Sequence, residues 1–425
     1  MKVESLKTQR QIDSAINRSY QIQSFGAFND YPQRVMEVVD ASATGSACVD
    51  TYRKFIVGRG FAEESFFKAV VNDKGQTADE VLQAVSADYA RFGGFALHVN
   101  YNALYQIVEV SHVPLEWVRF GELNADYDFD KVAVHPDWGK RYASLRRFIA
   151  SDIERYNLFD PSPDVIDAEV EAAGGWELYK GQILYFSNRG EKVYPMPIYR
   201  AVLTDMSNEE GLSNITQRNV RHNFLPAGML VDYDNTANTD EQQDETKEEL
   251  KAFQGDMAAG QLMYVNVREG ETPPEFKPFT ANNYDKAFTQ AEEKTPEIIG
   301  RAFVQPPILR AQDVGSNFGA TLMQNAYDFY NSITESERTV LEQTFKRVFD
   351  RWHDQSINAE RDYTILPKEY RVNMSIAEKL GANVDKVLDI LRDSALTESA
   401  KRVMLERIFN VSDDDINELL NGMRV

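Results

Sequence analysis

The stretch that decides the fold runs from Tyr284 to Tyr330, and residues 295–330 of it read TPEIIGRAFVQPPILRAQDVGSNFGATLMQNAYDFY. Up to Phe303 the pattern predicts a helix, because small and apolar residues share one face, at Ala287, Ala291, Ile298 and Ala302. Pro306 and Pro307 end that helix, since both rings fix φ, and the chain should leave Phe303 extended. Residues 310–317 then predict a polar loop, before a helical stripe resumes at Leu322, Met323, Ala326, Tyr327 and Tyr330.

A second long helix is predicted upstream, over residues 199–224. Its apolar stripe is thin, consisting of Val202, Met206, Val220 and Phe224, and Gly211 interrupts it. A polar helix needs neighbours for stability, so it suits packing against symmetry copies better than burial in one chain. Two short surface helices joined at Gly211 would give the same pattern.

A compact strand–helix–strand unit is predicted between these helices, after the break at Asn223-Phe-Leu-Pro-Ala-Gly228. Its strands cover residues 229–233 and 262–267, and its helix covers residues 239–253. Thr239 and Gln242 fit a capping box, and Gly255 is placed to end the helix.

The motif Phe303-Val-Gln-Pro-Pro307 and the order of elements around it resemble the portal proteins of tailed bacteriophages, of the siphophage type. That order covers residues 195–352, about a third of the chain. Portal proteins usually read Phe-Gly-Val-Pro-Pro here, and this chain has Val304-Gln305 in place of Gly-Val. The run Ala47-Cys-Val-Asp-Thr-Tyr52, in a helix closed by Gly58-Arg-Gly60, is also similar to their first long helix.

The resemblance implies an α+β, portal-like fold with a mixed α/β wing, a helical stem, a small α/β clip and a C-terminal helical crown. The implied division is an N-terminal arm at 1–30, the wing at 31–198 and 322–372, stem helices at 199–225 and 282–303, the clip at 226–281, the tunnel loop at 304–321 and the crown at 373–425. Pro296 departs from an unbroken second stem helix. With Thr295 as the N-cap, a kink or a new helix is expected there.

The remaining elements follow from periodicity alone. Helices are predicted at 32–61 and 78–91, an antiparallel meander of strands at 95–100, 104–110 and 115–120, and further strands near 128–134 and 182–186. The charged segment 141–175 gives no clear pattern. Another helix should restart at Thr334, capped with Glu337, and bury Leu341, Phe345, Val348 and Trp352. Short charged helices follow from residue 374 onward.

Composition limits the function. The 425 residues carry 46 basic and 67 acidic side chains, a net charge of −21, which argues against wrapping nucleic acid with a basic surface. A channel through which DNA slides would tolerate this charge. The single cysteine, Cys48, excludes a disulfide within the chain and fits a reducing cytoplasm. The start of the sequence has no signal peptide pattern, and no long uncharged apolar run predicts a membrane span.

No strong chemical motif is present, so we expect no catalytic, cofactor or metal site and no enzyme activity. His135-Pro-Asp137 is more typical of a turn with a capped backbone than of a catalytic loop. Asp126, Asp128 and Asp130 alternate as calcium ligands do, but the glycine and glutamate of a calcium loop are missing.

The resemblance also implies roles for particular residues. In the tunnel loop, it implies DNA-channel contacts at Arg310, Gln312, Asp313, Ser316 and Asn317, and a loop shaped by Pro306, Pro307, Gly315 and Gly319. In the clip, Glu245, Glu248 and Glu249 become candidates for docking the packaging motor.

The implied partners are further copies of the chain in a ring, dodecameric if it follows the family, the terminase large subunit, the major capsid or scaffolding protein, a head–tail adaptor and double-stranded DNA. No membrane is implied. Such a protein assembles in the bacterial cytoplasm and resides at the portal vertex of the virion. Two other classes stay open from the residues: a non-catalytic scaffold or other virion protein, and an enzyme whose site carries no recognisable motif. Formation of a closed ring separates the first reading from these.

Overall fold

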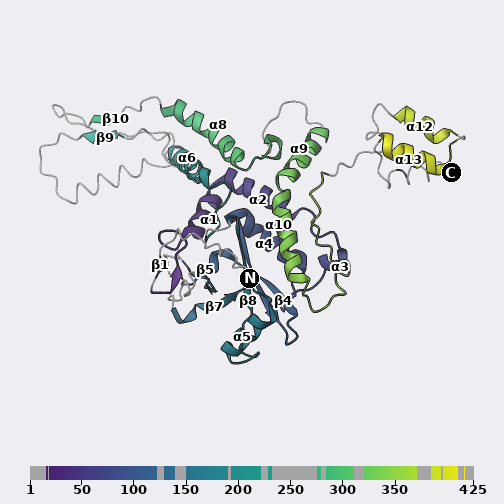
Figure 1. Cartoon of the computed structure of the whole chain (residues 1–425). Helices are drawn as coiled ribbons and strands as arrows, with labels where there is room; N and C mark the ends of the chain where they lie inside the picture. The colour runs from purple at the N-terminus through teal and green to yellow at the C-terminus, as the bar shows by residue number, and fades with distance from the viewer. Residues whose placement is uncertain are drawn as a thin grey trace, which may run out of the picture. The chain divides into compact units, whose positions relative to one another are not determined.

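The computed structural model describes residues 16–17, 19–121, 129–138, 150–189, 193–221, 228–231, 275–278, 284–310, 320–370, 384–393, 396–409 and 416 (Figure 1). The chain divides into two compact units, Met1–Glu369 and Tyr370–Val425. The fold is α+β, with helices beside a mixed sheet.

The centre of the first unit is a six-stranded sheet in the order β4-β3-β8-β7-β6-β5. Its strands are β3 (Gly94–Tyr101), β4 (Ile107–Val113), β5 (Val118–Phe120), β6 (Lys131–Val134), β7 (Glu154–Leu158) and β8 (Gln182–Ser187). Neighbours run antiparallel except β7 and β8, which are parallel.

The predicted meander is wrong beyond its first hairpin. β3 pairs with β4, but β5 pairs with β6 at the opposite edge of the sheet. Between β4 and β5 the chain forms a 3₁₀ turn, η1 (Leu115–Trp117), whose first amide donates to Asp88 Oδ2 at 2.8 Å. This turn directs β5 away from β4.

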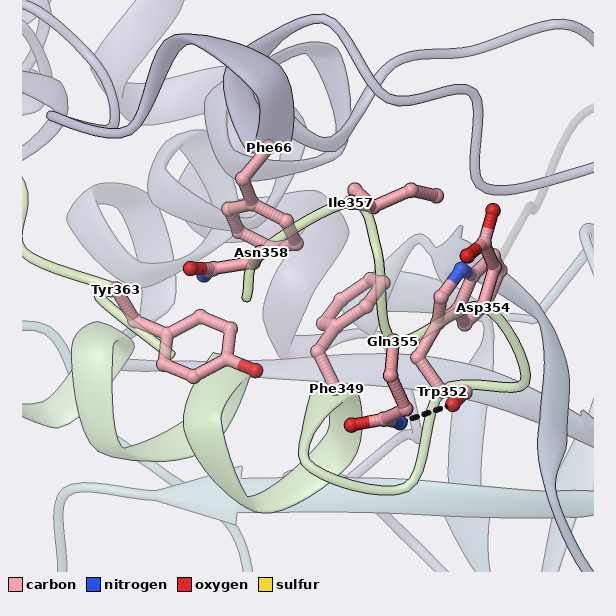
Figure 2. Close-up of a pocket in the computed structure, with 8 residues that line it drawn as sticks. All are labelled: Phe66, Phe349, Trp352, Asp354, Gln355, Ile357, Asn358 and Tyr363. Carbon is pink, nitrogen blue, oxygen red and sulfur yellow. Dashed lines mark hydrogen bonds between the residues drawn. The ribbon is translucent and has the colours of Figure 1, made fainter. Parts of the chain in front are cut away.

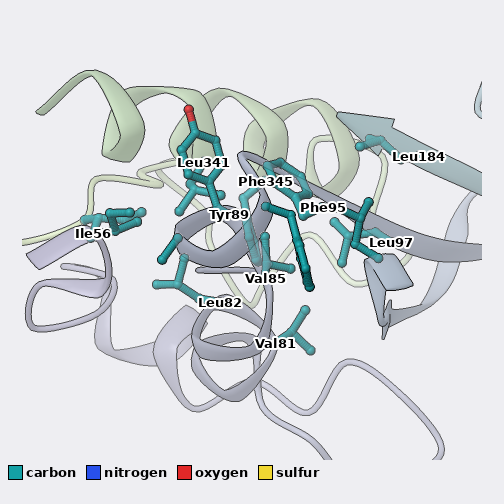
Figure 3. Packing of buried hydrophobic residues seen from close by; sticks show 14 of the residues in the cluster. Ile56, Val81, Leu82, Val85, Tyr89, Phe95, Leu97, Leu184, Leu341 and Phe345 are labelled. Carbon is teal, nitrogen blue, oxygen red and sulfur yellow. The ribbon is translucent and has the colours of Figure 1, made fainter. Parts of the chain in front are cut away.

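Helices α4 (Ala78–Phe92) and α10 (Glu335–Phe349) build the main core with the sheet. Figure 3 shows Val81, Leu82, Val85 and Tyr89 of α4 packed with Phe95 and Leu97 of β3 and with Leu341 and Phe345 of α10. The predicted stripe of α10 is confirmed, because Leu341, Phe345, Val348 and Trp352 are all buried. α4 begins in a capping box between Thr77 and Glu80.

The helix predicted at 32–61 is two helices. α1 (Tyr31–Ala41) ends at Ser42, which is also the N-cap of α2 (Ala43–Val57). Ser42 Oγ accepts from Gly45 N at 2.9 Å, so this side chain stabilises the second start. The short helix α3 (Glu64–Phe67) follows α2.

Part of the N-terminal segment expected to be an arm is packed into the first unit, because Ile22, Phe25, Asn29 and Asp30 are buried. After β1 (Ile16–Asn17), β2 (Ile22–Gln23) buries Ile22 beside Ala133 and Trp138. Arg119 of β5, fully buried, donates to the side chain and carbonyl of Asn29. Burial lowers the pKa of this guanidinium to about 10.

The segment 141–175, which gave no pattern, contains β7 and α5 (Pro163–Ala173), with the 3₁₀ turn η2 (Ala150–Asp152) before them. β7 reads Glu-Arg-Tyr-Asn-Leu and buries no side chain fully, so its alternation is limited to Tyr156 and Leu158, which pack against the core. α5 buries only Ile166 and Val170.

The two long polar helices are continuous. α6 (Leu203–Arg221) follows the 3₁₀ turn η3 (Arg200–Val202) and runs through Gly211, so the alternative of two joined helices is wrong. α8 (Tyr284–Ala302) contains Pro296 inside it, so the expected new helix start is wrong too. Between these helices, β9 (Gly228–Val231) pairs antiparallel with β10 (Glu275–Pro278). The predicted helix 239–253 and strand 262–267 lie outside the described residues.

After the 3₁₀ turn η5 (Pro307–Arg310), α9 (Ala320–Ile333) leads into α10. Thr334 is the N-cap of α10, but the predicted capping box is wrong. Its hydroxyl donates to Tyr330 O at 3.0 Å, and Glu337 accepts from Tyr52 Oη at 2.7 Å instead.

In the second unit, α12 (Val384–Arg392) and α13 (Glu398–Phe409) share a small cluster with Val387, Leu391, Leu405 and Ile416.

Candidate functional site

The end of α8 is a helix stop that a glycine would normally occupy. Val304 N donates to Arg301 O at 3.0 Å and Gln305 N donates to Gly300 O at 3.2 Å, which is the bond pattern of a Schellman motif. The residue in the left-handed position is Val304, with φ 53°. The motif of portal proteins has glycine at this position, so the substitution of valine places a β-branched residue in a strained conformation.

The residues on either side of Val304 anchor the helix end in the core. Phe303 is fully buried and stacks on Tyr199, with ring centroids 4.9 Å apart. Gln305 is 4% exposed, and its Nε2 donates to Cys48 O at 2.7 Å and to Tyr330 Oη at 3.0 Å. Gln305 therefore joins α2, the end of α8 and α9. The chain does not leave Phe303 extended as expected, because Val304 is left-handed and Pro307 begins η5.

Arg310, predicted to contact DNA, is half-buried and folds back on α8. Its Nη1 donates to Pro296 O at 3.1 Å, and its guanidinium crosses Gly300 where a Cβ would collide with it. Gly300 thus leaves the space that the guanidinium occupies. The guanidinium fixes the start of the loop to α8 and is engaged within the chain.

The other predicted channel residues, Gln312, Asp313, Gly315, Ser316, Asn317 and Gly319, lie outside the described residues. The same holds for the predicted motor-docking residues Glu245, Glu248 and Glu249. Of the predicted site residues, the structure therefore describes Pro306, Pro307 and Arg310. It also describes Phe303 and Gln305, which anchor this segment in the core.

α6 is joined to the core at its first turns. Glu209 accepts from the hydroxyl of Ser42, from Thr44 N at 3.2 Å and from Thr44 Oγ1 at 2.6 Å. These groups form the N-terminus of α2, where a carboxylate is favoured by the free amides and the helix dipole. Met206 lies against Gly45, where a Cβ would meet its sulfur at 2.9 Å. We call Ser42, Thr44 and Glu209 the α2–α6 clamp.

Beyond this clamp the two long helices bury little. Residues 207–217 of α6 include none that is buried, although α6 and α8 contact each other. Among the α8 side chains whose burial the structure describes, from residue 290 onward, those of 290–294 are not buried and Thr295 is the first buried one.

α9 presents an apolar stripe to solvent. Leu322, Phe329 and Ile333 are 42%, 49% and 37% exposed. Their spacing of seven and four residues places them on one face of the helix. We call them the α9 outer stripe.

A small pocket lies beside α10 and is lined mainly by the rings of Phe66, Phe349, Trp352 and Tyr363 (Figure 2). Three of its polar side chains form hydrogen bonds within the local chain. Asp354 accepts from Ser356 N at 3.0 Å, Asn358 accepts from Asp362 N at 2.9 Å, and Gln355 donates to Trp352 O. This arrangement offers no pair of acid and base groups for catalysis.

His135 forms the predicted turn, with its Nδ1 accepting from Asp137 N at 3.0 Å. Within the described ranges, no group of three or more His, Cys, Asp or Glu residues could hold a metal ion. No helix in the described part is long and apolar enough to cross a membrane.

Several anchoring residues escaped the sequence analysis. Glu209 and Gln305 act through partners far away in the chain, so no local pattern marks them. For Val304 a signal was present, since it stands where portal proteins have glycine.

No protein-family model and no curated protein matches the chain. Among solved structures, the chain is similar to one in the neck of a native gene transfer agent particle, with a TM-score of 0.48 and 14% identity over 88% of this chain and 93% of that one. It is also similar to a chain in the neck of the empty particle, with a TM-score of 0.47, 14% identity, and 88% and 93% coverage. A portal protein of the HK97 phage family from Corynebacterium diphtheriae gives a TM-score of 0.37 and 12% identity over 81% of this chain and 94% of that one. At these identities the similarity concerns the fold alone.

Proposed function

We propose that the chain is a phage portal protein, which forms a closed ring around a DNA channel at one vertex of a capsid. The observation that carries this proposal is the length of α6 and α8 left unburied beyond the α2–α6 clamp. α6 has 19 residues, yet residues 207–217 bury no side chain fully. Such helices gain stability when copies of the chain pack side by side, and a repeated head-to-tail contact closes into a ring.

The α9 outer stripe supports the same assembly. Three large apolar side chains gathered on one helix face are typical of a surface that another protein covers. A neighbouring subunit would bury them. In a cyclic ring every subunit offers this stripe to a different surface of its neighbour, so all copies are covered alike.

We assign residues 304–321 as a tunnel loop that touches DNA, with Gln312, Asp313, Ser316 and Asn317 facing the channel and Gly315 and Gly319 permitting the return. Residues 310–319 contain one cation, Arg310, and one acid, Asp313, and the Arg310 guanidinium donates to Pro296 O on α8, so the loop can neutralise few phosphates. Few neutralised phosphates mean weak binding, which suits DNA that must keep moving.

Replacing residues 312–317 with a Gly-Ser linker tests the tunnel loop. Rings should form as before, and packaging or retention of DNA should fall. Unchanged packaging would make this an ordinary exposed loop, and loss of rings would place it in a subunit interface.

The assignment as a portal protein also implies which other proteins the ring contacts. We propose that the unit between α6 and α8 docks the terminase large subunit, and that the ring contacts the capsid or scaffolding protein and a head–tail adaptor in the virion. Charge reversal at Glu245, Glu248 and Glu249 to lysine should leave rings intact and weaken motor docking. If packaging by the triple variant equals that of the wild type, this helix is only a solubilising surface.

A further inference from the structure

An exposed apolar patch lies where the β3–β4 hairpin meets the segment after α5. Leu104 is 74% exposed, Leu178 is 65% exposed and Trp176 is 36% exposed. Tyr105 joins the two segments, because its ring lies 6.2 Å from that of Trp176. We call these four residues the hairpin patch. Single exposed apolar residues are ordinary, but residues from two separate segments gathered at one place indicate a contact surface.

The hairpin side of the patch is held in a strained, fixed conformation. Tyr105 has φ 59°, which a residue with a large side chain rarely adopts. Asn102 Oδ1 fixes the turn by accepting from Leu104 N at 2.9 Å and from Gln106 N at 3.0 Å. Tyr105 Oη donates to the carboxylate of Asp167 in α5 at 2.9 Å. These hydrogen bonds fix the turn in a conformation that leaves Leu104 exposed to solvent.

The segment after α5 is fixed as well. α5 ends in a Schellman motif, with Gly174 N donating to Glu171 O at 3.1 Å and Gly175 N donating to Val170 O at 2.9 Å. Trp176 then packs edge-on against Tyr179, with centroids 5.9 Å apart, and Tyr179 Oη donates to Glu169 at 2.8 Å. A surface ordered before binding loses less conformational entropy when a partner docks.

The charge around the patch selects the partner. Residues 162–180 carry one basic side chain, Lys180, against five acidic ones, Asp164, Asp167, Glu169, Glu171 and Glu177. The field at the patch therefore repels nucleic acid and anionic lipid. A second copy of the same acidic surface is disfavoured for the same reason, whereas a basic partner is attracted.

We propose that the hairpin patch docks a basic segment of another protein, one that places large apolar side chains beside lysine or arginine. The apolar side chains cover Leu104, Trp176 and Leu178, and the cations face the acidic residues of α5. This inference does not depend on ring formation, since the patch involves neither the α9 outer stripe nor the α2–α6 clamp.

The test uses two designed amphipathic peptides of the same pattern, one of leucine and lysine and one of leucine and glutamate. Binding to the full chain is followed by fluorescence anisotropy at several salt concentrations. We expect the lysine peptide to bind with an affinity that falls with salt, and the glutamate peptide to bind at least tenfold more weakly. The double variant L104S/L178S, which keeps the net charge, should lose at least tenfold in affinity for the lysine peptide.

V403S/I408S is the matched control, because Val403 and Ile408 of α13 are also exposed, at 48% and 65%. Its affinity should stay within twofold of the wild type, and thermal melting should show that both double variants fold. Tryptophan emission gives an independent readout, since it should shift to the blue on binding in the wild type and not in W176F.

Equal binding of the lysine peptide by the wild type and L104S/L178S would overturn the proposal, because attraction to the net charge would then explain it. Equal binding of both peptides, or an emission shift that W176F retains, would overturn it as well.

Discussion

Val304 holds a left-handed conformation that suits glycine, at the point where α8 stops. In this conformation, the steric strain of a residue with a Cβ costs roughly 1–2 kcal/mol. Glycine avoids that strain, but fixing its backbone on folding costs about 0.5–1 kcal/mol more in entropy. We therefore expect V304G to raise the free energy of unfolding by roughly 0.5–1 kcal/mol in urea denaturation. The control V57G, at a helical position near the end of α2, should lower it by about 1 kcal/mol. If both variants lose stability, the strain at Val304 is absent.

Arg119 is a buried cation that fastens the segment 22–30 to β5. Besides its bonds to Asn29, its Nη1 donates to Glu116 O at 2.9 Å and to Val118 O at 2.8 Å. R119M would leave these buried acceptors unpaired, and we expect a loss of about 3–5 kcal/mol in the free energy of unfolding. R53M, which removes a surface ion pair with Asp50, should cost under about 1 kcal/mol. A loss for R119M as small as that for R53M would contradict this account.

Cys48 is the only thiol, and burial raises its pKa from 9.0 to about 11. Because the folded state holds this proton more tightly, the stability it contributes is fully present below pH 9 and is lost as the pH rises through 11. At pH 8 the native thiol should react with DTNB at least tenfold more slowly than the thiol in urea. Rapid labelling of the folded chain would show that the anchor around Gln305 is open to solvent.

At the scale of elements, the α2–α6 clamp is the contact that attaches a long polar helix to the core. Glu209 accepts three hydrogen bonds there, so E209A should lower the free energy of unfolding by about 2 kcal/mol. Glu210, its exposed neighbour, provides the control, and E210A should change stability by less than about 0.5 kcal/mol. Equal effects of the two substitutions on urea denaturation would mean that the clamp contributes nothing.

Elements with a strong local period were predictable, and those set by distant contacts were not. The stripe of α10 and the strands β3 and β8 follow from the spacing of apolar residues. The place of β5 depends on the turn at Leu115 and its bond to Asp88, which no spacing reveals. The break at Ser42 was missed although no large apolar residue lies between Val39 and Cys48 and serine is a typical N-cap. At the end of α8 the sequence marks Pro306 and Pro307, whereas Gln305 and Arg310 bond to residues distant in the chain, so no local pattern predicts their contacts.

Two features of the whole molecule point to assembly: residues 207–217 of α6 and 290–294 of α8 are not buried, and the α9 outer stripe is left in solvent. Both are covered if copies of the chain pack side by side. The double variant F329S/I333S should therefore weaken assembly without unfolding the chain, whose core these side chains do not enter. V403S/I408S, with similar exposure in α13, should assemble as the wild type does.

Native mass spectrometry of the purified full chain, over a range of salt and protein concentration, tests the central claim most directly. We expect a closed ring of one defined stoichiometry, with twelve copies if the chain follows the portal family, and a shift to smaller species in F329S/I333S. Monomers or dimers alone at every salt and concentration would contradict the portal assignment and favour a scaffold or an enzyme that works without a ring.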